Sequence, residues 1–161
     1  LPLEDFYTGY RKNLLATDEL LVRILVPKPR SGELLRAYKV SKRTDDDISA
    51  VCLAIQLTLR DGQVQAASIG VGGVAATPVR ARATEAVLTG APWNEATLAR
   101  AADSLRNEFQ PLSDMRASGE YRRALLAHLL ERYWLESTGS GPVLATLIPL
   151  AQAAAAQKAK A

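Results

Sequence analysis

The sequence has little of the residues that enzymes use most often to bind metals or attack substrates. Its 161 residues include one cysteine, Cys52, and one histidine, His128. A single cysteine cannot form a disulfide within the chain, and it cannot hold an iron–sulfur cluster, which takes four thiolates. A single histidine inside a predicted helix, without a serine on a strand-to-helix elbow, does not form a Ser-His-Asp triad. We therefore expect no metal site and no catalytic residue in this chain.

Membrane and nucleic-acid partners also lack support. The sequence has no secretory signal and no apolar stretch long enough to span a membrane. Its formal net charge is +3, from 20 basic and 17 acidic residues, which is too small an excess to indicate nucleic-acid binding. Cys52 lies in an apolar alternating run, so we interpret it as a small buried residue rather than a reactive thiol. A lone thiol fits a reducing compartment, and we expect a cytoplasmic protein.

Residues 34–73 carry a pattern typical of strands. Residues 51–59 alternate, with one apolar face for a core and a second face of small and polar side chains. Asp61-Gly62 then predicts a hairpin turn, and residues 64–71 form the returning strand, which ends at Gly72-Gly73. A shorter strand is predicted over residues 36–40. An earlier β-rich run, residues 20–26, stops at Pro27.

Residues 77–136 predict three helices. The first begins with Thr77 as N-cap and Pro78 in the first turn, and it runs to about Thr89. The second begins at Asn94, where Trp93 can pack on Leu98, and Pro111 closes it. The third runs from about Ser118 to Glu136 and includes Trp134 on a broad apolar face. Strands followed by helices predict an α+β fold, with a small antiparallel sheet of three or four strands and a three-helix layer on one face.

Composition divides the sequence into three regions. Two prolines and Ser31-Gly32 separate residues 1–33 from the strands and helices of residues 34–137. Residues 138–161 begin with a Gly- and Ser-rich break and continue as an alanine-rich tail. The first residues, from Leu1 to Phe6, have the composition of the inside of a folded protein. We therefore expect that an N-terminal part precedes this chain or lies elsewhere.

One charged segment has two interpretations. Between Lys39 and Ile48, three basic residues come just before three aspartates. The segment can be a solvated loop, or a loop that sets the electric field beside a redox cofactor. In the second case a lysine can pair with an anionic reduced flavin or a phosphate. In a later cluster, Arg116 and Arg122 can pair with acids or reach a neighbouring domain, and we favour a structural role for it.

Five segments, taken in order, resemble a known family. They are Phe6-Tyr7-Thr8-Gly9-Tyr10-Arg11-Lys12, Tyr38-Lys39-Val40-Ser41-Lys42-Arg43, Asp46-Asp47-Ile48-Ser49-Ala50-Val51, Gly72-Gly73-Val74-Ala75-Ala76-Thr77-Pro78 and Pro111-Leu112-Ser113-Asp114-Met115-Arg116-Ala117-Ser118. Over residues 3 to about 135 the chain resembles the C-terminal portion of the FAD-binding subunit of bacterial xanthine dehydrogenases, in the molybdenum hydroxylase superfamily. Each segment alone is a weak signal, but the five together are specific.

The resemblance implies a division of labour between subunits. Purine oxidation would occur at a molybdenum cofactor on a large partner subunit, and two [2Fe–2S] clusters would pass electrons to FAD, which reduces NAD. Residues 1–33 would be the end of the flavin-binding middle subdomain, and residues 34–137 the C-terminal α+β domain. The Gly-rich loop that holds the flavin pyrophosphate, and the iron–sulfur cysteines, would belong to a missing N-terminal region.

The same resemblance assigns individual residues. Lys39 matches the family lysine that contacts FAD, and Leu21 matches a leucine that lines the flavin pocket. Asp46 matches an acid on a loop beside the isoalloxazine ring, which is thought to influence flavin potential and NAD access. Arg43 and Asp47 flank that position.

Three hypotheses follow. The chain can be part of a flavin site that is inactive alone, or an interaction module that docks on the molybdenum subunit through its helices, with Trp134 exposed. It can also be part of the FAD subunit of a carbon monoxide dehydrogenase. We rank this third hypothesis lower because residues 46–48 and 113–116 are more similar to the xanthine branch.

Overall fold

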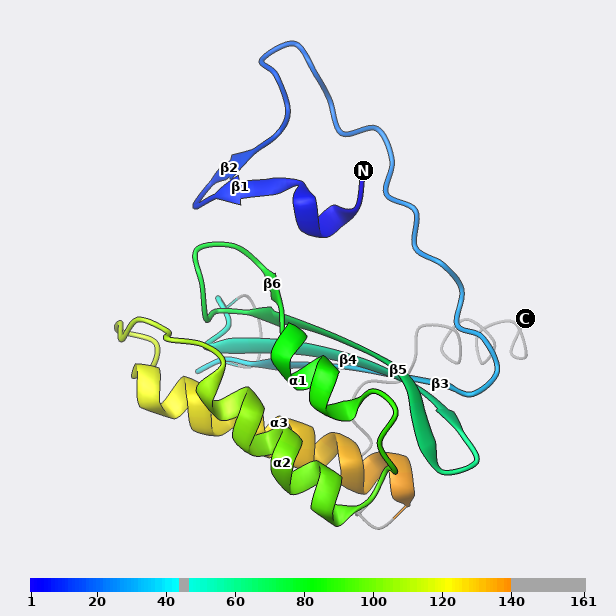
Figure 1. Cartoon of the computed structure of the whole chain (residues 1–161). Helices are drawn as coiled ribbons and strands as arrows, with labels where there is room; N and C mark the ends of the chain where they lie inside the picture. Colours follow the sequence, from blue (N-terminus) through cyan, green and yellow to red (C-terminus); the bar gives the residue numbers. More distant parts are fainter. Residues whose placement is uncertain (44–46, 140–161) are drawn as a thin grey trace, which may run out of the picture.

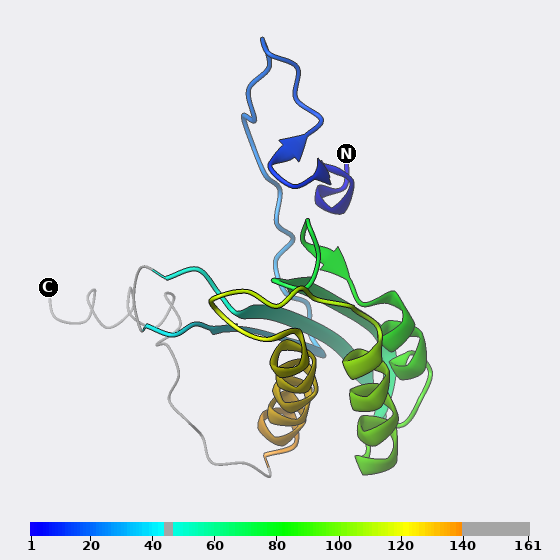
Figure 2. The same ribbon diagram turned by 90° about the vertical axis from the view of Figure 1, so that its left-hand side faces the viewer.

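The chain folds as a sheet with helices on one face and a separate N-terminal segment on the other side (Figures 1 and 2). The computed structural model describes residues 1–43 and 47–139. The elements are η1 (Leu3–Asp5), β1 (Tyr7–Gly9), β2 (Lys12–Asn13), β3 (Glu33–Val40), β4 (Val51–Arg60), β5 (Gln63–Gly72), β6 (Val79–Arg80), α1 (Arg82–Leu88), α2 (Glu95–Asn107) and α3 (Gly119–Thr138). The main sheet is antiparallel in the order β3-β4-β5-β6. The predicted α+β class is confirmed.

The core forms between the sheet and the helices because β4 alternates as the sequence predicts. Val51, Leu53, Ile55 and Leu57 are fully buried on the helix side. Each such side chain contributes about 1.5–3 kcal/mol when it leaves water. They pack with buried side chains of α2 and α3 in one continuous cluster.

The opposite face of the sheet is open, and the side chains beside Lys39 on that face are small. In the strand register, Lys39 of β3 lies opposite Cys52 of β4, which lies opposite Gly72 of β5. The next row on this face consists of Ala37, Ala54 and Gly70. Cys52 is therefore half-buried on the open face and is not in the core. The prediction of a buried cysteine was wrong because the two-residue period of a strand turns it away from Leu53.

The hairpin between β4 and β5 is confirmed. Asp61 and Gly62 have φ angles of 52° and 73°. Positive φ at both central residues gives a tight turn whose twist matches that of the flanking strands.

The first helix starts later than Thr77. Val79 and Arg80 pair with Val71 and Gly70 and form β6, so the helix begins at Arg82. Its first turn has no cap from its own side chains. The Glu108 carboxylate, just after α2, accepts hydrogen bonds instead from the Ala83 and Thr84 amides at 2.8 and 3.0 Å. A cap from a distant residue leaves no local sequence signal, which is why the prediction failed.

The two longer helices begin where the sequence predicts. The Asn94 side chain accepts a hydrogen bond from the Thr97 amide at 3.0 Å, and the Ser118 side chain accepts one from the Tyr121 amide at 3.1 Å. α2 ends at Asn107, before Pro111. α3 continues to Thr138 and ends with Gly139 in the left-handed conformation. The alanine-rich tail beyond Gly139 lies outside the described residues.

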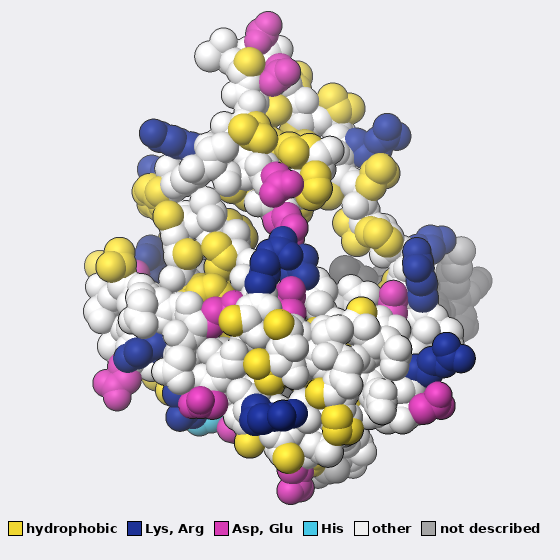
Figure 3. All heavy atoms as spheres, viewed as in Figure 1, with side chains coloured by type: hydrophobic (Ala, Val, Ile, Leu, Met, Phe, Trp, Pro, Cys, Tyr) yellow, Lys and Arg dark blue, Asp and Glu magenta, His cyan; other side chains and the backbone are white. Residues whose placement is uncertain are grey.

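The N-terminal segment lies on the side of the sheet away from the helices (Figures 1 and 2). Residues 20–26 form no strand, contrary to the β-rich pattern, and Leu20 and Val22 are 85% and 91% exposed. Within the described residues, this run pairs with no strand. Glu4 ties the segment to the body through Arg80 at 2.9 Å and Arg82 at 2.7 Å. Figure 3 shows acidic and basic side chains gathered where the segment meets the body.

The distant cap on α1 predicts a measurable loss of stability. Replacement of Glu108 by alanine should lower the free energy of unfolding by about 1–2 kcal/mol, because two amides and the Thr84 hydroxyl lose their acceptor. Denaturant titration followed by circular dichroism measures this. Glu131→Ala is the control, because Glu131 has no hydrogen bond or ion pair among the described residues. Equal stability of the two variants would show that the cap contributes nothing.

Candidate functional site

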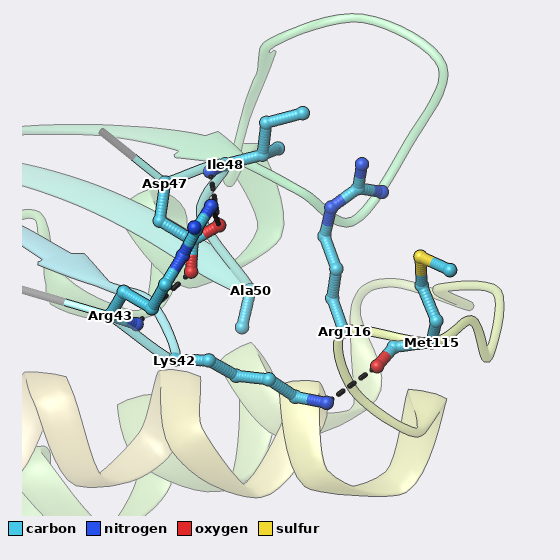
Figure 4. Close-up of a pocket in the computed structure, with 7 residues that line it drawn as sticks. All are labelled: Lys42, Arg43, Asp47, Ile48, Ala50, Met115 and Arg116. Carbon is cyan, nitrogen blue, oxygen red and sulfur yellow. Dashed lines mark hydrogen bonds and ion pairs between the residues drawn. The ribbon is translucent and has the colours of Figure 1, made fainter. Parts of the chain in front are cut away.

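Two loops at one end of the sheet border an open pocket of about 570 Å³. One loop, residues 41–50, joins β3 to β4, and the other, residues 111–118, leads into α3. We call the space between them the loop pocket (Figure 4), and its lining consists of Lys42, Arg43, Asp47, Ile48, Ala50, Met115 and Arg116. The pocket is therefore built from three of the segments that carry the family resemblance.

Arg43 and Asp47 contact each other within the first loop. The Arg43 amide donates to the Asp47 carboxylate at 3.0 Å, and its guanidinium lies 3.5 Å from the same group. The Ile48 amide donates to Asp47 as well. These contacts, the Arg43 amide above all, lower the pKa of the Asp47 carboxyl below its ordinary value. The Asp47 carboxylate is therefore held by two backbone amides and lies beside the Arg43 guanidinium.

Lys42 connects the two loops. Its Nζ donates a hydrogen bond to the Met115 carbonyl oxygen at 2.6 Å, as Figure 4 shows. Ile48 and Met115 are 64% and 84% exposed. The pocket thus combines basic side chains with two exposed apolar ones.

Asp114 shapes the second loop. Its Oδ1 accepts hydrogen bonds from the Arg116 and Ala117 amides at 2.9 and 3.1 Å, and from Arg122 Nη2 at 2.6 Å. Its Oδ2 lies 3.2 Å from Arg116 Nη1. The backbone amide of Arg116, more than any other contact, lowers the pKa of the Asp114 carboxyl to about 2.

Arg122 lies behind the pocket, where three segments meet. It is only 4% exposed and donates through Nη1 to the Ala50 and Gly73 carbonyl oxygens. Gly73 has a φ of 85°, and a Cβ there would lie 2.5 Å from the Ala50 carbonyl oxygen. A side chain at position 73 would therefore collide with the backbone that Arg122 holds.

The residues predicted to contact the cofactor lie in different places. Arg43 and Asp47 come together in the loop pocket. Lys39 is exposed on the open face of the sheet and does not line the pocket. Leu21 lies on the N-terminal segment, 51% exposed. Asp46 lies outside the described residues.

The sequence interpretation missed part of this site. Lys42, Met115 and Arg116 line the pocket together, although they come from loops far apart in the chain. The expectation that Arg116 and Arg122 pair with acids is confirmed, since both contact Asp114. The charged run and the Asp114 segment were the available signals. Neither one indicated that the two loops meet.

Two further classes of feature are not found in residues 1–43 and 47–139. No group of three or more histidine, cysteine or acidic side chains is arranged to hold a metal ion there. Within the same ranges, no helix has the length and apolar character needed to cross a membrane.

Comparison with known proteins identifies a family. Residues 36–137 match the CO dehydrogenase flavoprotein C-terminal domain. Nicotinate hydroxylase of Emericella nidulans is 38% identical over 83% of this chain, and xanthine dehydrogenase/oxidase of Gallus gallus is 33% identical over 82%. The chain spans 10% of the length of each of these two proteins.

Solved structures show the same architecture. A carbon monoxide dehydrogenase chain from Hydrogenophaga pseudoflava superimposes with a TM-score of 0.74 at 28% identity, over 80% of this chain and 44% of that one. Quinoline 2-oxidoreductase from Pseudomonas putida gives a TM-score of 0.72 at 27% identity, over 85% and 47%.

The depressed pKa of Asp114 predicts a pH-dependent contribution to stability. A carboxyl whose folded pKa is about 2 stabilises the fold above its ordinary value of 3.8, and this contribution is lost as the pH falls through about 2. Asp114→Asn should therefore lower the Tm at neutral pH, and its difference from the wild type should shrink as the pH approaches about 2. Asp61→Asn, in the exposed hairpin turn, should show no such trend. A difference for Asp114→Asn that does not change with pH would contradict this assignment.

Proposed function

Because the chain belongs to the CO dehydrogenase flavoprotein C-terminal domain family, we propose that it completes the FAD site of a molybdenum hydroxylase-type oxidoreductase. In the whole enzyme, [2Fe–2S] clusters would pass electrons from a purine, oxidised at a molybdenum cofactor on the large subunit, to FAD and then to NAD. Residues 1–33 would be the end of the middle flavin subdomain, residues 34–137 the C-terminal domain and residues 138–161 its tail. The enzyme would act in the cytoplasm.

The observation that carries this proposal is the position of Lys39. Its ammonium group is exposed on the open sheet face and has no partner among the described residues. Its cross-strand neighbours on that face, Cys52 and Gly72, are small. A lysine with free space beside it can pair with an anionic part of a flavin. Leu21 would add an apolar contact from the N-terminal segment, on the same side of the sheet.

The residues present fit a part of FAD and not the whole molecule. A dinucleotide needs a glycine-rich loop or an equivalent cradle for its pyrophosphate. The sequence has no such loop with the usual spacing. Bound FAD would supply the electron-accepting chemistry, and this chain would supply charge and shape beside it. Lys39, Asp46, Arg43 and Asp47 would set the electric field at that place.

The loop pocket suits access by NAD. Its volume of about 570 Å³ lies in the range of small-molecule sites, roughly 300–1,000 Å³. Lys42, Arg43 and Arg116 outnumber Asp47, the acidic side chain of the lining, and favour an anionic ligand. The exposed Ile48 and Met115 favour a planar apolar part. A pyridine dinucleotide has both features.

The alternatives gain less support. Docking on the molybdenum subunit was expected to use an exposed Trp134, but Trp134 is half-buried and its indole N–H is fully enclosed. A carbon monoxide dehydrogenase has the same fold. In our proposal the oxidised substrate binds on another subunit, so the choice between a purine and another substrate depends on that subunit.

The isolated chain should not bind FAD with measurable saturation. Too few contacts are present to offset the loss of freedom of the ligand on binding. Fluorescence titration of FAD with the purified chain measures this directly. A purified sample that carries one flavin per chain would contradict the incomplete site.

In the flavoenzyme that contains this chain, Lys39→Ala should weaken FAD binding about tenfold, because a hydrogen bond to a charged group contributes about 1.5 kcal/mol or more. The measurements are the flavin content after purification and the Kd for FAD of the apoprotein. Arg60→Ala is the matched control, since Arg60 is a basic residue at the other end of the same sheet and its side chain is 81% exposed. Equal Kd values for the two variants would count against the flavin site.

A further inference from the structure

We propose that Arg122 is a positioning residue for the loop pocket, because its one guanidinium holds both loops that line the pocket. The inference deepens the proposed function and rests on it, since the pocket is the place assigned to NAD. Arg122 does not line the pocket itself. It acts through the residues that do.

The first connection runs to the loop between β3 and β4. Arg122 Nη1 donates to the Ala50 carbonyl oxygen, and Ala50 lines the pocket. The same nitrogen donates to the Gly73 carbonyl oxygen at 2.8 Å, just after β5. The end of this loop is thereby fixed to the sheet.

The second connection runs to the loop before α3. Arg122 Nη2 holds Asp114 at 2.6 Å, and Asp114 in turn accepts from the Arg116 and Ala117 amides. That turn presents the Met115 carbonyl to Lys42. A continuous chain of hydrogen bonds therefore runs from Arg122 to the pocket lining on both sides.

A guanidinium suits these three acceptors, although the buried Nε–H of Arg122 has no hydrogen-bond partner among the described residues. Three acceptors from three segments surround one planar group, and a guanidinium presents several N–H donors in one plane. A lysine keeps the charge but offers a single nitrogen. Because Arg122 is 4% exposed, water cannot readily replace the contacts that a shorter side chain loses.

Loss of the Arg122 contacts should have a local effect, because other residues also hold α3 in place. Leu126 and Leu130 are fully buried in the core, and the Tyr133 hydroxyl donates to the Leu34 carbonyl at 2.7 Å. Loss of the Arg122 contacts therefore leaves the helix packed and releases the loops. Local opening of loops with few buried contacts needs less free energy than global unfolding.

Limited trypsin digestion of the 161-residue chain, with products identified by mass spectrometry, tests the local effect. In Arg122→Gln, cleavage after Lys42 should rise about tenfold relative to cleavage after Arg60, which is the last residue of β4, next to the hairpin turn at the other end of that strand. Arg123→Gln is the matched control, since Arg123 is the next residue and has no hydrogen bond or ion pair among the described residues. An unchanged ratio, or an equal rise at both places, would overturn the inference.

A conservative variant and a kinetic measurement separate positioning from simple stability. Arg122→Lys should recover most of the Tm lost in Arg122→Gln, but not the protection of Lys42. In the flavoenzyme, both variants should raise the KM for NAD about fivefold or more, while the rate at which substrate reduces the enzyme stays unchanged. An unchanged KM for NAD would overturn the positioning role even if the loops open.

If the proposed function fails, the experiments give a different set of results. In that case Lys39→Ala would leave FAD binding intact, whereas the trypsin ratio would still report whether Arg122 holds the loops. Failure of the inference alone would leave the effect of Lys39→Ala in place.

Discussion

The alternation of β4 is the constraint on which the rest of the structure depends. Its inward side chains, such as Leu53 and Ile55, are fully buried against the helices, so a shift by one residue would expose all of them. The register therefore also fixes the outward face. It places Cys52 between Lys39 and Gly72, so the groups beside Lys39 on that face are small. The same strand begins right after Ala50, so the buried core also determines where the loop pocket lies.

Polar contacts hold the parts of the chain that lie outside the core. Glu85, only 8% exposed, accepts from the Ile69 amide and forms an ion pair with Arg80, and Arg80 also contacts Glu4. These groups fix the short β6 and connect the N-terminal segment to the body. The segment itself leaves large apolar side chains in solvent, among them Leu20 and Val22. Such exposure has a cost in water. It is what we expect of a segment whose neighbours, in the proposed enzyme, belong to the middle flavin subdomain.

Those parts of the fold that depend on local sequence could be predicted. The period of β4, the Asp61-Gly62 turn and the caps at Asn94 and Ser118 are each encoded within a few residues, and the structure contains all of them. The predictions failed where distant residues decide. The start of α1 depends on Glu108, and the run 20–26 lacks a partner strand. The loop pocket belongs to the second group, because no local pattern indicates that Lys42 reaches the Met115 carbonyl.

The separation between Lys39 and Arg122 explains how one small domain can serve two demands. In the proposed function Lys39 contacts the cofactor and must stay accessible, and it is exposed on the open face. A residue that holds loops in place must be shielded from competing water, so Arg122 lies behind them and is almost fully buried. The exposed surroundings of Lys39 and the buried surroundings of Arg122 lie near each other, because Lys39 and Ala50 flank the same loop. The sheet separates them. A change on the open face can therefore alter the proposed cofactor contact without disturbing the loops. A change at Arg122 can move the loops while Lys39 stays on its strand.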